Sequence, residues 1–310
     1  MKMDPTVYDK KDGNTFLHFA AMANQADVIK QFYKHTSIDA KNNVGNTPLH
    51  EACIRGNHEA VLQLIGVKAM ANIPNAKGET ALHVSAYCQF IQPATIARLI
   101  EYVMSTHPWE SLNIKDKMGN NPLHIAAKHA RPDVMWEFRF VRFKDTDEDL
   151  NIALHESIRS GEPECLDTML DIYDAMKRDC DINHQNKKGE TPLYLAAKHG
   201  FLDGLRRIML YGADINIPNE KKDTPLHLLT RLSVASQAQS QRYLEIIDAI
   251  LEKAPSWYLQ KNQHKGSEGD TERQQFVKRR AILALVAETY NSSDLSVLGL
   301  ACKVGKERGR

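Results

Sequence analysis

The sequence has no long hydrophobic run and no excess of charge of one sign. No segment approaches the ~18 consecutive apolar residues of a membrane-spanning helix, and the first residues, Met1 to Pro5, lack the apolar core of a secretory signal. The 40 Lys and Arg nearly balance the 39 Asp and Glu, and a net charge of +1 gives no general attraction to nucleic acid or anionic membranes. We therefore expect a soluble, cytoplasmic protein in which any charge signal is local.

Cysteine is also scarce. The five cysteines are Cys53, Cys88, Cys165, Cys180 and Cys302. They form no C-x-x-C pair, and a scattered, odd-numbered set is typical of free thiols in a reducing compartment. No metal-ligand spacing links them to histidines, and the G-x-x-x-x-G-K-[ST], G-x-S-x-G and H-E-x-x-H patterns are missing. The sequence thus predicts no metal, no cofactor and no catalytic site.

The sequence does contain one recurring stretch, which reads N-T-P-L-H-E-A-C at residues 46–53. Variants of it occur at residues 14–21, 79–86, 120–127, 151–158, 190–197 and 223–230. Measured at the Thr position, the copies lie at Thr15, Thr47, Thr80, Asn121, Ile152, Thr191 and Thr224, so the successive steps are 32, 33, 41, 31, 39 and 33 residues. A base period of 33 residues with insertions indicates an array of small structural units.

A 33-residue period with T-P-L-H and a following pair of small residues resembles the ankyrin repeat, in which a turn precedes two antiparallel helices. The resemblance covers about residues 9–254 and implies an all-α solenoid of seven repeats. We assign residues 1–254 to the array, 255–271 to an exposed loop or linker, and 272–310 to C-terminal helices with a degenerate half-repeat at 296–305. That half-repeat either caps the array or belongs to a chain that continues beyond Arg310.

The residue types of the motif explain its helices. Glycines two places before the Thr position suit a tight turn with positive φ; they are Gly13, Gly45, Gly78, Gly119 and Gly189. Thr is a favoured N-cap, Pro fits the first helical position, and the Leu that follows is the expected core anchor. The resemblance implies that a motif histidine hydrogen-bonds within the turn and to neighbouring backbone, at His18, His50, His83, His124, His155 and His227.

The third, fourth and fifth repeats depart from the pattern. In the third, the apolar stripe of a long second helix continues toward Met104 before the run from Thr106 to Trp109 breaks it. In the fourth, the aromatic run from Trp136 to Phe143 alternates like a strand, but its place in the repeat favours a helix with apolar residues on more than one side. In the fifth, the acidic run from Asp145 to Asp149 stands in the loop before the first helix, and the second helix is expected from Pro163 to Lys177.

The resemblance also implies a protein-binding surface on the loops before the first helices and on the exposed side of those helices. At the two positions that follow the small pair, it assigns Met22, Ile54, Arg55, Tyr87, Lys128, His129, Arg159, Lys198, His199, Arg231 and Leu232. Five of the seven repeats place Lys or Arg there. The loop tips add Lys10, Lys11, Lys77, Lys117, Lys187, Lys188, Lys221 and Lys222, which favours an acidic partner.

We predict a non-catalytic, monomeric protein-binding module that engages its partner through the concave face of the array. Its irregular repeats resemble ankyrin proteins that intracellular bacteria deliver into the host cytosol, which implies an effector acting on a host protein. The alternative is the targeting part, or a Cys-dependent catalytic part, of a larger effector enzyme, with Cys53 near His50 or Cys88 near His83 as the reactive pair. Cys53 stands where other repeats have Ala, so a small core residue explains it more simply. The aromatic run from Trp136 is a second candidate interface, against packing between repeats.

Overall fold

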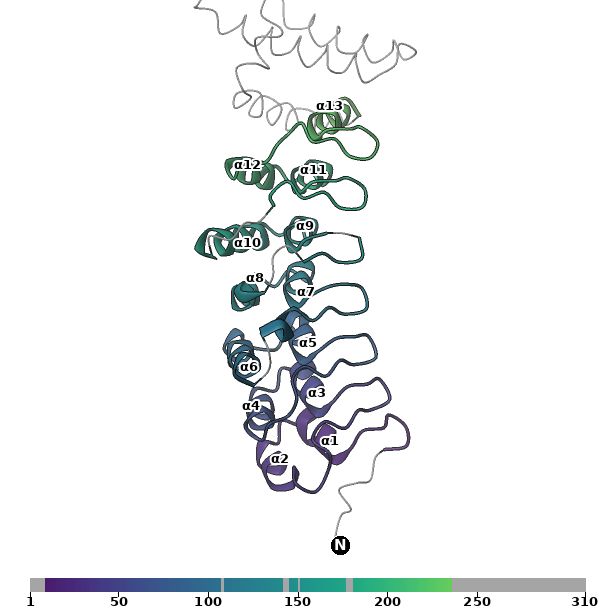
Figure 1. The fold of residues 1–310 in the computed structure, drawn as a ribbon, viewed down its shortest axis with the longest axis vertical. Coiled ribbons are helices and arrows are strands. Elements are labelled where there is room, and N and C mark those ends of the chain that lie inside the picture. Colours follow the sequence, from purple (N-terminus) through teal and green to yellow (C-terminus); the bar gives the residue numbers. More distant parts are fainter. Residues whose placement is uncertain (1–8, 107–108, 142–144, 150, 177–180, 236–310) are drawn as a thin grey trace, which may run out of the picture. The chain divides into compact units, whose positions relative to one another are not determined.

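The computed structural model describes residues 9–106, 109–141, 145–149, 151–176 and 181–235 of the chain (Figure 1). It divides into two compact units, Met1–Lys187 and Lys188–Arg310, which are described separately below. The predicted linker at 255–271, the C-terminal helices at 272–310, the half-repeat, Cys180 and Cys302 lie outside the described residues. No helix within the described residues is both long enough and apolar enough to span a membrane.

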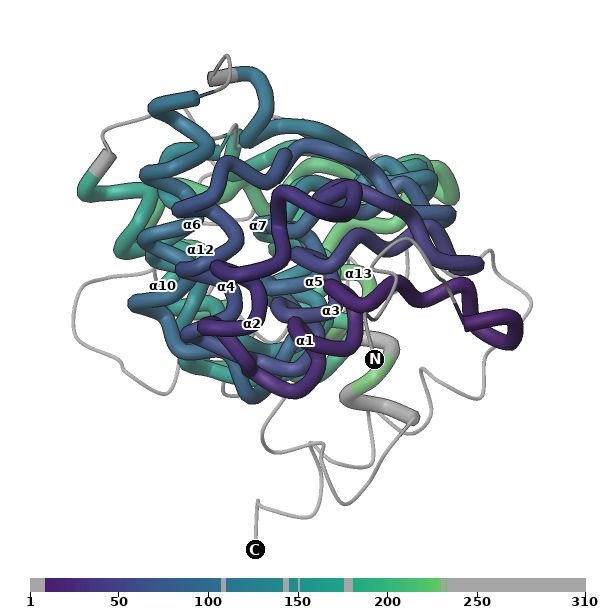
Figure 2. The backbone as a smooth tube through the Cα atoms, turned by 90° about the horizontal axis from the view of Figure 1, so that it is seen from below, coloured from purple at the N-terminus to yellow at the C-terminus, as the bar shows by residue number. Residues whose placement is uncertain are grey.

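The first unit contains five helical pairs in two layers. Its first helices are α1 (Phe16–Met22), α3 (Pro48–Arg55), α5 (Ala81–Tyr87), α7 (Pro122–Lys128) and α9 (Ala153–Arg159). Its second helices are α2 (Ala26–Phe32), α4 (His58–Gly66), α6 (Pro93–Thr106), α8 (Pro132–Met135) and α10 (Pro163–Met176), with the 3₁₀ helices η1 (Trp109–Asn113) and η2 (Trp136–Phe140). Each first helix packs on the next, and Figure 2 separates α1, α3 and α5 from α2, α4 and α6. In Figure 1 the loops before α3, α5, α7 and α9 project from the same side.

The second unit begins with the helical pair α11 (Pro192–Lys198) and α12 (Leu202–Leu210), followed by α13 (Pro225–Ala235). α11 packs on both α12 and α13, as expected for a first helix between its own partner and the next repeat. Seven first helices therefore begin where the sequence motif predicts them, and the all-α ankyrin-type fold is confirmed.

The motif residues act at the helix starts as predicted. Thr47 has extended backbone before α3, its Oγ1 accepts from the His50 amide, and Pro48 fills the first helical position. The predicted glycines all have positive φ. At Gly45, a Cβ atom would lie 2.5 Å from the backbone nitrogen of Ala76 in the next loop, so glycine is required for space as well as for φ. The motif leucines from Leu17 to Leu193 are buried, which fixes this face of each first helix in the core.

The aromatic run of the fourth repeat forms a helix, but not the α-helix that the repeat pattern suggested. After the single turn of α8, residues Trp136–Phe140 are 3₁₀, Val141 is extended, and Phe143 lies outside the described residues. The reason is the spacing of the apolar residues. Met135, Phe138 and Val141 are three residues apart and all buried, so the 3₁₀ segment and the two residues that bound it turn to the core at a three-residue period.

The two long second helices form where the spacing predicts them. α6 runs to Thr106, the first residue of the predicted break from Thr106 to Trp109. α10 begins at Pro163, as predicted, and is described as far as Met176. Buried Ile96, Leu99 and Val103 line α6 at helical spacing, so its extra length is anchored by core contacts.

Candidate protein-binding surface

An Asn or Asp five residues before the Thr position holds five of the loops that precede first helices. In the third repeat, Asn75 Oδ1 accepts from the amides of Lys77 (2.9 Å) and Glu79 (3.0 Å), and the Asn75 amide donates to the Glu79 carbonyl (2.8 Å). The same side-chain contacts recur at Asn42, Asp116, Asp147 and Asn219. These Asx turns close the loop without help from the helices. They hold the exposed loop tips in a fixed conformation.

The motif histidines connect successive loops. His50 Nδ1 accepts from the Thr47 amide and hydroxyl at 3.1 and 2.8 Å, while Nε2 donates 3.0 Å to the Glu79 carbonyl of the next repeat. Equivalent Nε2 bonds join His18 to Asn46, His83 to Asn120, and His124 to Asn151. Loop tips are joined as well, since the amides of Asn43, Ala76, Lys117, Glu148 and Lys187 donate to carbonyls of the preceding tips. The loops of the first unit thus form a continuous bonded row.

Burial sets the charge state of these histidines. It lowers the pKa of His50 to about 4, and lowers the pKa values of His18, His83 and His124 as well. At His18, His50 and His83, a neutral ring with its proton on Nε2 matches the observed bonds, because Nδ1 then accepts and Nε2 donates. The structural role predicted for the motif histidines is confirmed. They add no positive charge to the surface at neutral pH.

The predicted surface residues lie at the C-terminal ends of the first helices. In the first unit, Arg55, Lys128, His129 and Arg159 are exposed, whereas Met22, Ile54 and Tyr87 are half-buried. In the second unit, Lys198 and His199 are exposed at the end of α11, and the side chain of Arg231 lies outside the described residues. The lysines of the loop tips are all exposed. The structure thus displays two parallel rows in the first unit, one of helix ends and one of loop tips.

Not every basic residue of these rows carries an unbalanced charge. Arg159 donates 2.9 Å to Glu156, whose side chain is only 3% exposed, and Lys198 donates 2.8 Å to buried Glu190. Arg55 and Lys128 have no ion pair within the described part of the chain. Burial, then the neighbouring Lys128 ammonium, lowers the pKa of His129. Within the two rows of the first unit, the positive charge therefore lies mainly at Arg55, Lys128 and the loop lysines.

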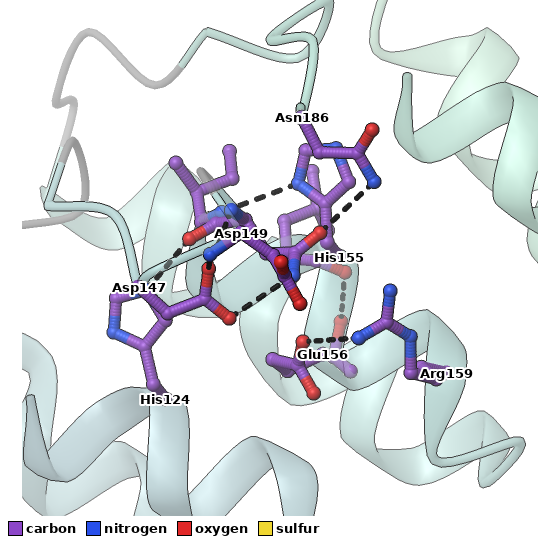
Figure 3. Close-up of polar contacts among 11 residues, drawn as sticks. His124, Asp147, Asp149, His155, Glu156, Arg159 and Asn186 are labelled. Carbon is purple, nitrogen blue, oxygen red and sulfur yellow. Dashed lines mark hydrogen bonds and ion pairs between the residues drawn. The ribbon is translucent and has the colours of Figure 1, made fainter. Parts of the chain in front are cut away.

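The loop tip of the fifth repeat is acidic, whereas the tips of the third and fourth repeats are basic. Asp147 accepts from the amides of Asp149 and Asn151, each at 2.8 Å, and Figure 3 shows Asp147 and Asp149 near His155 and the Glu156–Arg159 pair. Glu148 and Asp149 are exposed at this tip, where the third and fourth loops expose Lys77 and Lys117. The predicted basic face is thus bounded by an acidic loop.

Two family models match the sequence. One, described as ankyrin repeats (3 copies), matches residues 2–75, and the other, described as ankyrin repeats (many copies), matches residues 177–229. The chain is built of ankyrin repeats. This array is therefore a protein–protein interaction module, of a fold that typically serves as a non-catalytic binding scaffold.

One curated protein and two solved ankyrin repeat domains are similar to this chain. The transient receptor potential cation channel subfamily A member 1 of Homo sapiens is 25% identical over 205 residues, which are 64% of this chain and 18% of the channel. The ankyrin repeat domain of Bcl-3 superposes with a TM-score of 0.61 at 21% identity, covering 77% of this chain and 100% of that domain. The ankyrin repeat domain of human ASB11 gives a TM-score of 0.57 at 19% identity, over 69% and 91% of the two chains. At these identities the structural likeness shows the fold alone.

The cysteines of the described ankyrin repeats are buried. Cys53, Cys88 and Cys165 are free thiols, and burial raises the pKa values of Cys53 and Cys165. A nucleophilic thiol needs the opposite environment, because the thiolate is the reactive form. Cys53 is a core residue of α3, as its alignment with Ala in other repeats predicted. No cluster of three or more potential metal ligands occurs among the residues that the structure describes.

The aromatic run of the fourth ankyrin repeat divides between core and surface. Phe138 is fully buried, whereas Trp136 is 39% exposed. The Arg139 guanidinium lies over the rings of both Trp136 (5.8 Å) and Phe140 (4.5 Å) and 3.7 Å from Glu137. Packing therefore accounts for Phe138, and the interface stays a prediction for the exposed Trp136.

Sequence reasoning missed three features that shape the surface of the ankyrin array: the recurring Asn or Asp of the loops, Arg131 and Phe90. The recurring Asn or Asp of the loops was visible as an echo between N-I-P-N at residues 72–75 and 216–219, but its bonding role was not predicted. Arg131 is 7% exposed and donates to the carbonyls of Cys88 and Ile91. Phe90, in the loop between those two residues, is 78% exposed, and nothing in the repeat pattern singles it out.

Proposed function

We propose that the first unit binds a protein partner through the exposed ends of α3, α5 and α7 and the adjoining basic loop tips, and that the partner presents acidic side chains there. The observation that carries the proposal is the exposure of Arg55 and Lys128 without an ion pair in the described part of the chain. Lys77 and Lys117 extend the positive charge along the loop row. Such charge raises association rates and selects partners more than it sets affinity.

The structure sharpens which residues test the proposal. Replacing Arg159 or Lys198 by Glu would place a second carboxylate beside a buried glutamate. The expected loss of folding would then obscure a loss of binding. Arg55→Glu with Lys128→Glu avoids this problem, because both side chains are exposed and unpaired within the described residues. Lys30→Glu with Arg98→Glu, exposed on α2 and α6, is the control with the same change in net charge. Arg98 pairs with Glu101, but both side chains are well exposed, so the loss of this pair costs little stability.

Quantitative affinity purification from eukaryotic lysate with these chains tests the proposal. We expect a protein retained by the native chain and by the Lys30/Arg98 control to be lost with the Arg55/Lys128 variant. Its retention on the native chain should also fall as salt rises, because charges on exposed surfaces are screened within a Debye length of ~8 Å at physiological ionic strength. Equal retention by both variants would contradict the basic surface.

The finer predictions about context stay predictions of the sequence. Delivery into a host cytosol as a bacterial effector, a cytoplasmic location and a monomeric state rest on the irregular repeats and composition. The acidic partner surface is supported by the geometry of Arg55 and Lys128. Purification from host and bacterial lysates in parallel tests the effector role, which predicts that the retained partner is a host protein.

A further inference from the structure

The loop between α5 and α6 leaves the ankyrin pattern in a particular way. Other first helices end near a residue with positive φ, as at Gly56 and Gly161, but α5 ends at Cys88 with an extended conformation, φ −70° and ψ 117°. The chain then passes through Phe90 before α6 begins at Pro93. At 78% exposure, Phe90 is the most exposed large hydrophobic side chain among the described residues.

The backbone on both sides of Phe90 is fixed. Cys88 and Ile91 are 5% and 2% exposed, and the carbonyls of both accept from the Arg131 guanidinium. Asp133 holds that guanidinium through two bonds, at 2.8 Å from Nε and 2.7 Å from an Nη atom. The chain two residues before Phe90 and one residue after it is therefore anchored by a buried arginine from the next repeat, while Phe90 itself is exposed to solvent.

The preceding repeat supports the same loop. The Cys88 thiol donates 3.1 Å to the Ile54 carbonyl, and the Phe90 backbone packs against Gly56, where a Cβ atom would lie 2.5 Å from the Phe90 carbonyl carbon. Phe90 is thus held by the repeat before it and the repeat after it. An aromatic side chain on such a rigid support loses little conformational entropy on binding, which suits it to act as an interface anchor.

The surroundings of Phe90 combine aromatic and basic groups. Arg55 adjoins Gly56 in sequence, and Tyr87 lies three residues before Phe90 at the end of α5. The Tyr87 ring packs against His129 with centroids 5.5 Å apart, and Lys128 precedes His129 at the end of α7. We define these residues, Arg55, Tyr87, Phe90, Lys128 and His129, as the Phe90 patch. The Phe90 patch combines the apolar side chain of Phe90 with Arg55 and Lys128, the two cations of the proposed surface.

We propose that the Phe90 patch recognises a partner segment in which an apolar side chain packs on Phe90 while flanking carboxylates pair with Arg55 and Lys128. This inference rests on the proposed function and specifies the chemistry of its partner. The apolar side chain supplies burial at the centre, and the carboxylates fix its position. An acidic segment without an apolar residue would bind only through screened surface charge.

Selection of a random phage-displayed peptide library on the full chain tests this inference. We expect peptides enriched on the native chain to carry a large apolar residue flanked by Asp or Glu. Synthetic fluorescent copies should lose at least tenfold in affinity, measured by anisotropy, with Phe90→Ser. The conservative Phe90→Leu should retain most of the affinity. Leu210→Ser, which removes another side chain that is 68% exposed, should leave it unchanged.

The outcomes separate this inference from the proposed function. Enriched acidic peptides that lose affinity with Arg55→Glu and Lys128→Glu, but bind Phe90→Ser as well as the native chain, would overturn the Phe90 anchor and support the basic surface. Enrichment of no acidic peptide on the native chain would count against both. Loss with Phe90→Ser and with the charge reversal, at unchanged helicity, supports both.

Discussion

The second and fifth repeats, whose motifs begin at Thr47 and Ile152, build the same loop from different residues. The second has Asn42, Gly45 and Thr47 at its loop, whereas the fifth has Asp147 and Ile152. Even so, Asn42 and Asp147 each accept from the amides two and four residues ahead, and the amide of each donates to the carbonyl four residues ahead. The Asx turn and the backbone therefore specify the loop. The remaining motif residues adjust its stability.

The buried motif histidines predict the largest effect, which is a loss of folding stability in acid. Burial lowers the folded-state pKa of His50 to about 4 from an ordinary value of 6.5, so the unfolded chain binds the proton more tightly. The contribution of His50 to the free energy of unfolding is therefore full above pH 6.5 and is lost as the pH falls toward 4. The shift corresponds to about 3 kcal/mol from His50, with further losses in the same direction from His18, His83 and His124.

Urea unfolding followed by circular dichroism between pH 7 and pH 4 measures this loss. The slope of stability against pH should become shallower in His50→Gln, because that variant has no group to titrate at this position. An unchanged slope would contradict the role of His50. The equivalent bond of the fifth repeat is longer: the Ile152 amide donates to His155 Nδ1 at 3.3 Å, whereas the Thr47 amide donates to His50 Nδ1 at 3.1 Å.

Glycines at equivalent positions in the two repeats predict the next effect. Gly56 and Gly161 both lie nine residues after the motif start, with φ of 67° and 75°. A Cβ at Gly56 would lie 2.5 Å from the Phe90 backbone, whereas nothing lies within 4 Å of one at Gly161. Gly161→Ala should cost about 1 kcal/mol for the left-handed backbone alone, and Gly56→Ala about 3 kcal/mol or more.

Urea midpoints of the two glycine variants give the test. Ala130 has φ 53° at the equivalent position of the fourth repeat, so the conformation itself tolerates a side chain where space permits. Equal costs at Gly56 and Gly161 would show that Phe90 yields to the added methyl group. That result would weaken the argument that the Phe90 loop is rigid.

The helix caps of the two repeats differ by one hydroxyl. Thr47 Oγ1 lies 2.8 Å from His50 Nδ1 and accepts from the His50 amide, whereas Ile152 has no acceptor. Thr47→Val should cost about 1–2 kcal/mol, as loss of an N-cap with a buried hydrogen bond. Ile152→Thr should cost less than about 1 kcal/mol, because a new cap offsets the lost apolar burial. A cost above about 2 kcal/mol at Ile152 would show that no cap forms.

The repeats show which parts of the structure the sequence determines locally. Thr, Pro and Gly at fixed positions act within one loop and one helix start, so the first helices and the long α6 and α10 were predictable from spacing alone. The histidine role followed from the resemblance to the ankyrin repeat, which the same residue at successive motif positions supported. Local chemistry repeated at a fixed period is enough to place these elements.

The parts that the sequence did not predict depend on contacts between repeats. The exposure of Phe90 follows from Arg131, which lies 41 positions later and holds the flanking carbonyls. The 3₁₀ form of η2 follows from burial of Met135 and Phe138, which no single-repeat pattern fixes. The pairing of Arg159 with Glu156 likewise became visible only when Glu156 proved to be buried.

Glutamates at equivalent positions predict the smallest effect. Glu51 of the second repeat accepts from the Asn42 and Asn46 side-chain amides, at 3.1 and 2.8 Å, whereas Glu156 of the fifth accepts from Arg159 at 2.9 Å. Burial raises the pKa of Glu156, and Arg159 opposes this rise. Both folded and unfolded chains hold a protonated Glu156 well below pH 4.5, so the cost of its buried charge appears only as pH rises above that value.

Arg159→Met should therefore destabilise the chain at pH 7 but not at pH 4. The expected difference from the native chain is below about 1 kcal/mol at pH 7, because the Arg159 side chain is 40% exposed and its pairing is screened by solvent. Comparing the two chains at each pH removes the histidine contribution, which they share. A loss of equal size at both pH values would mean that Arg159 stabilises the fifth repeat by packing its methylene groups, and that Glu156 tolerates burial without a cation.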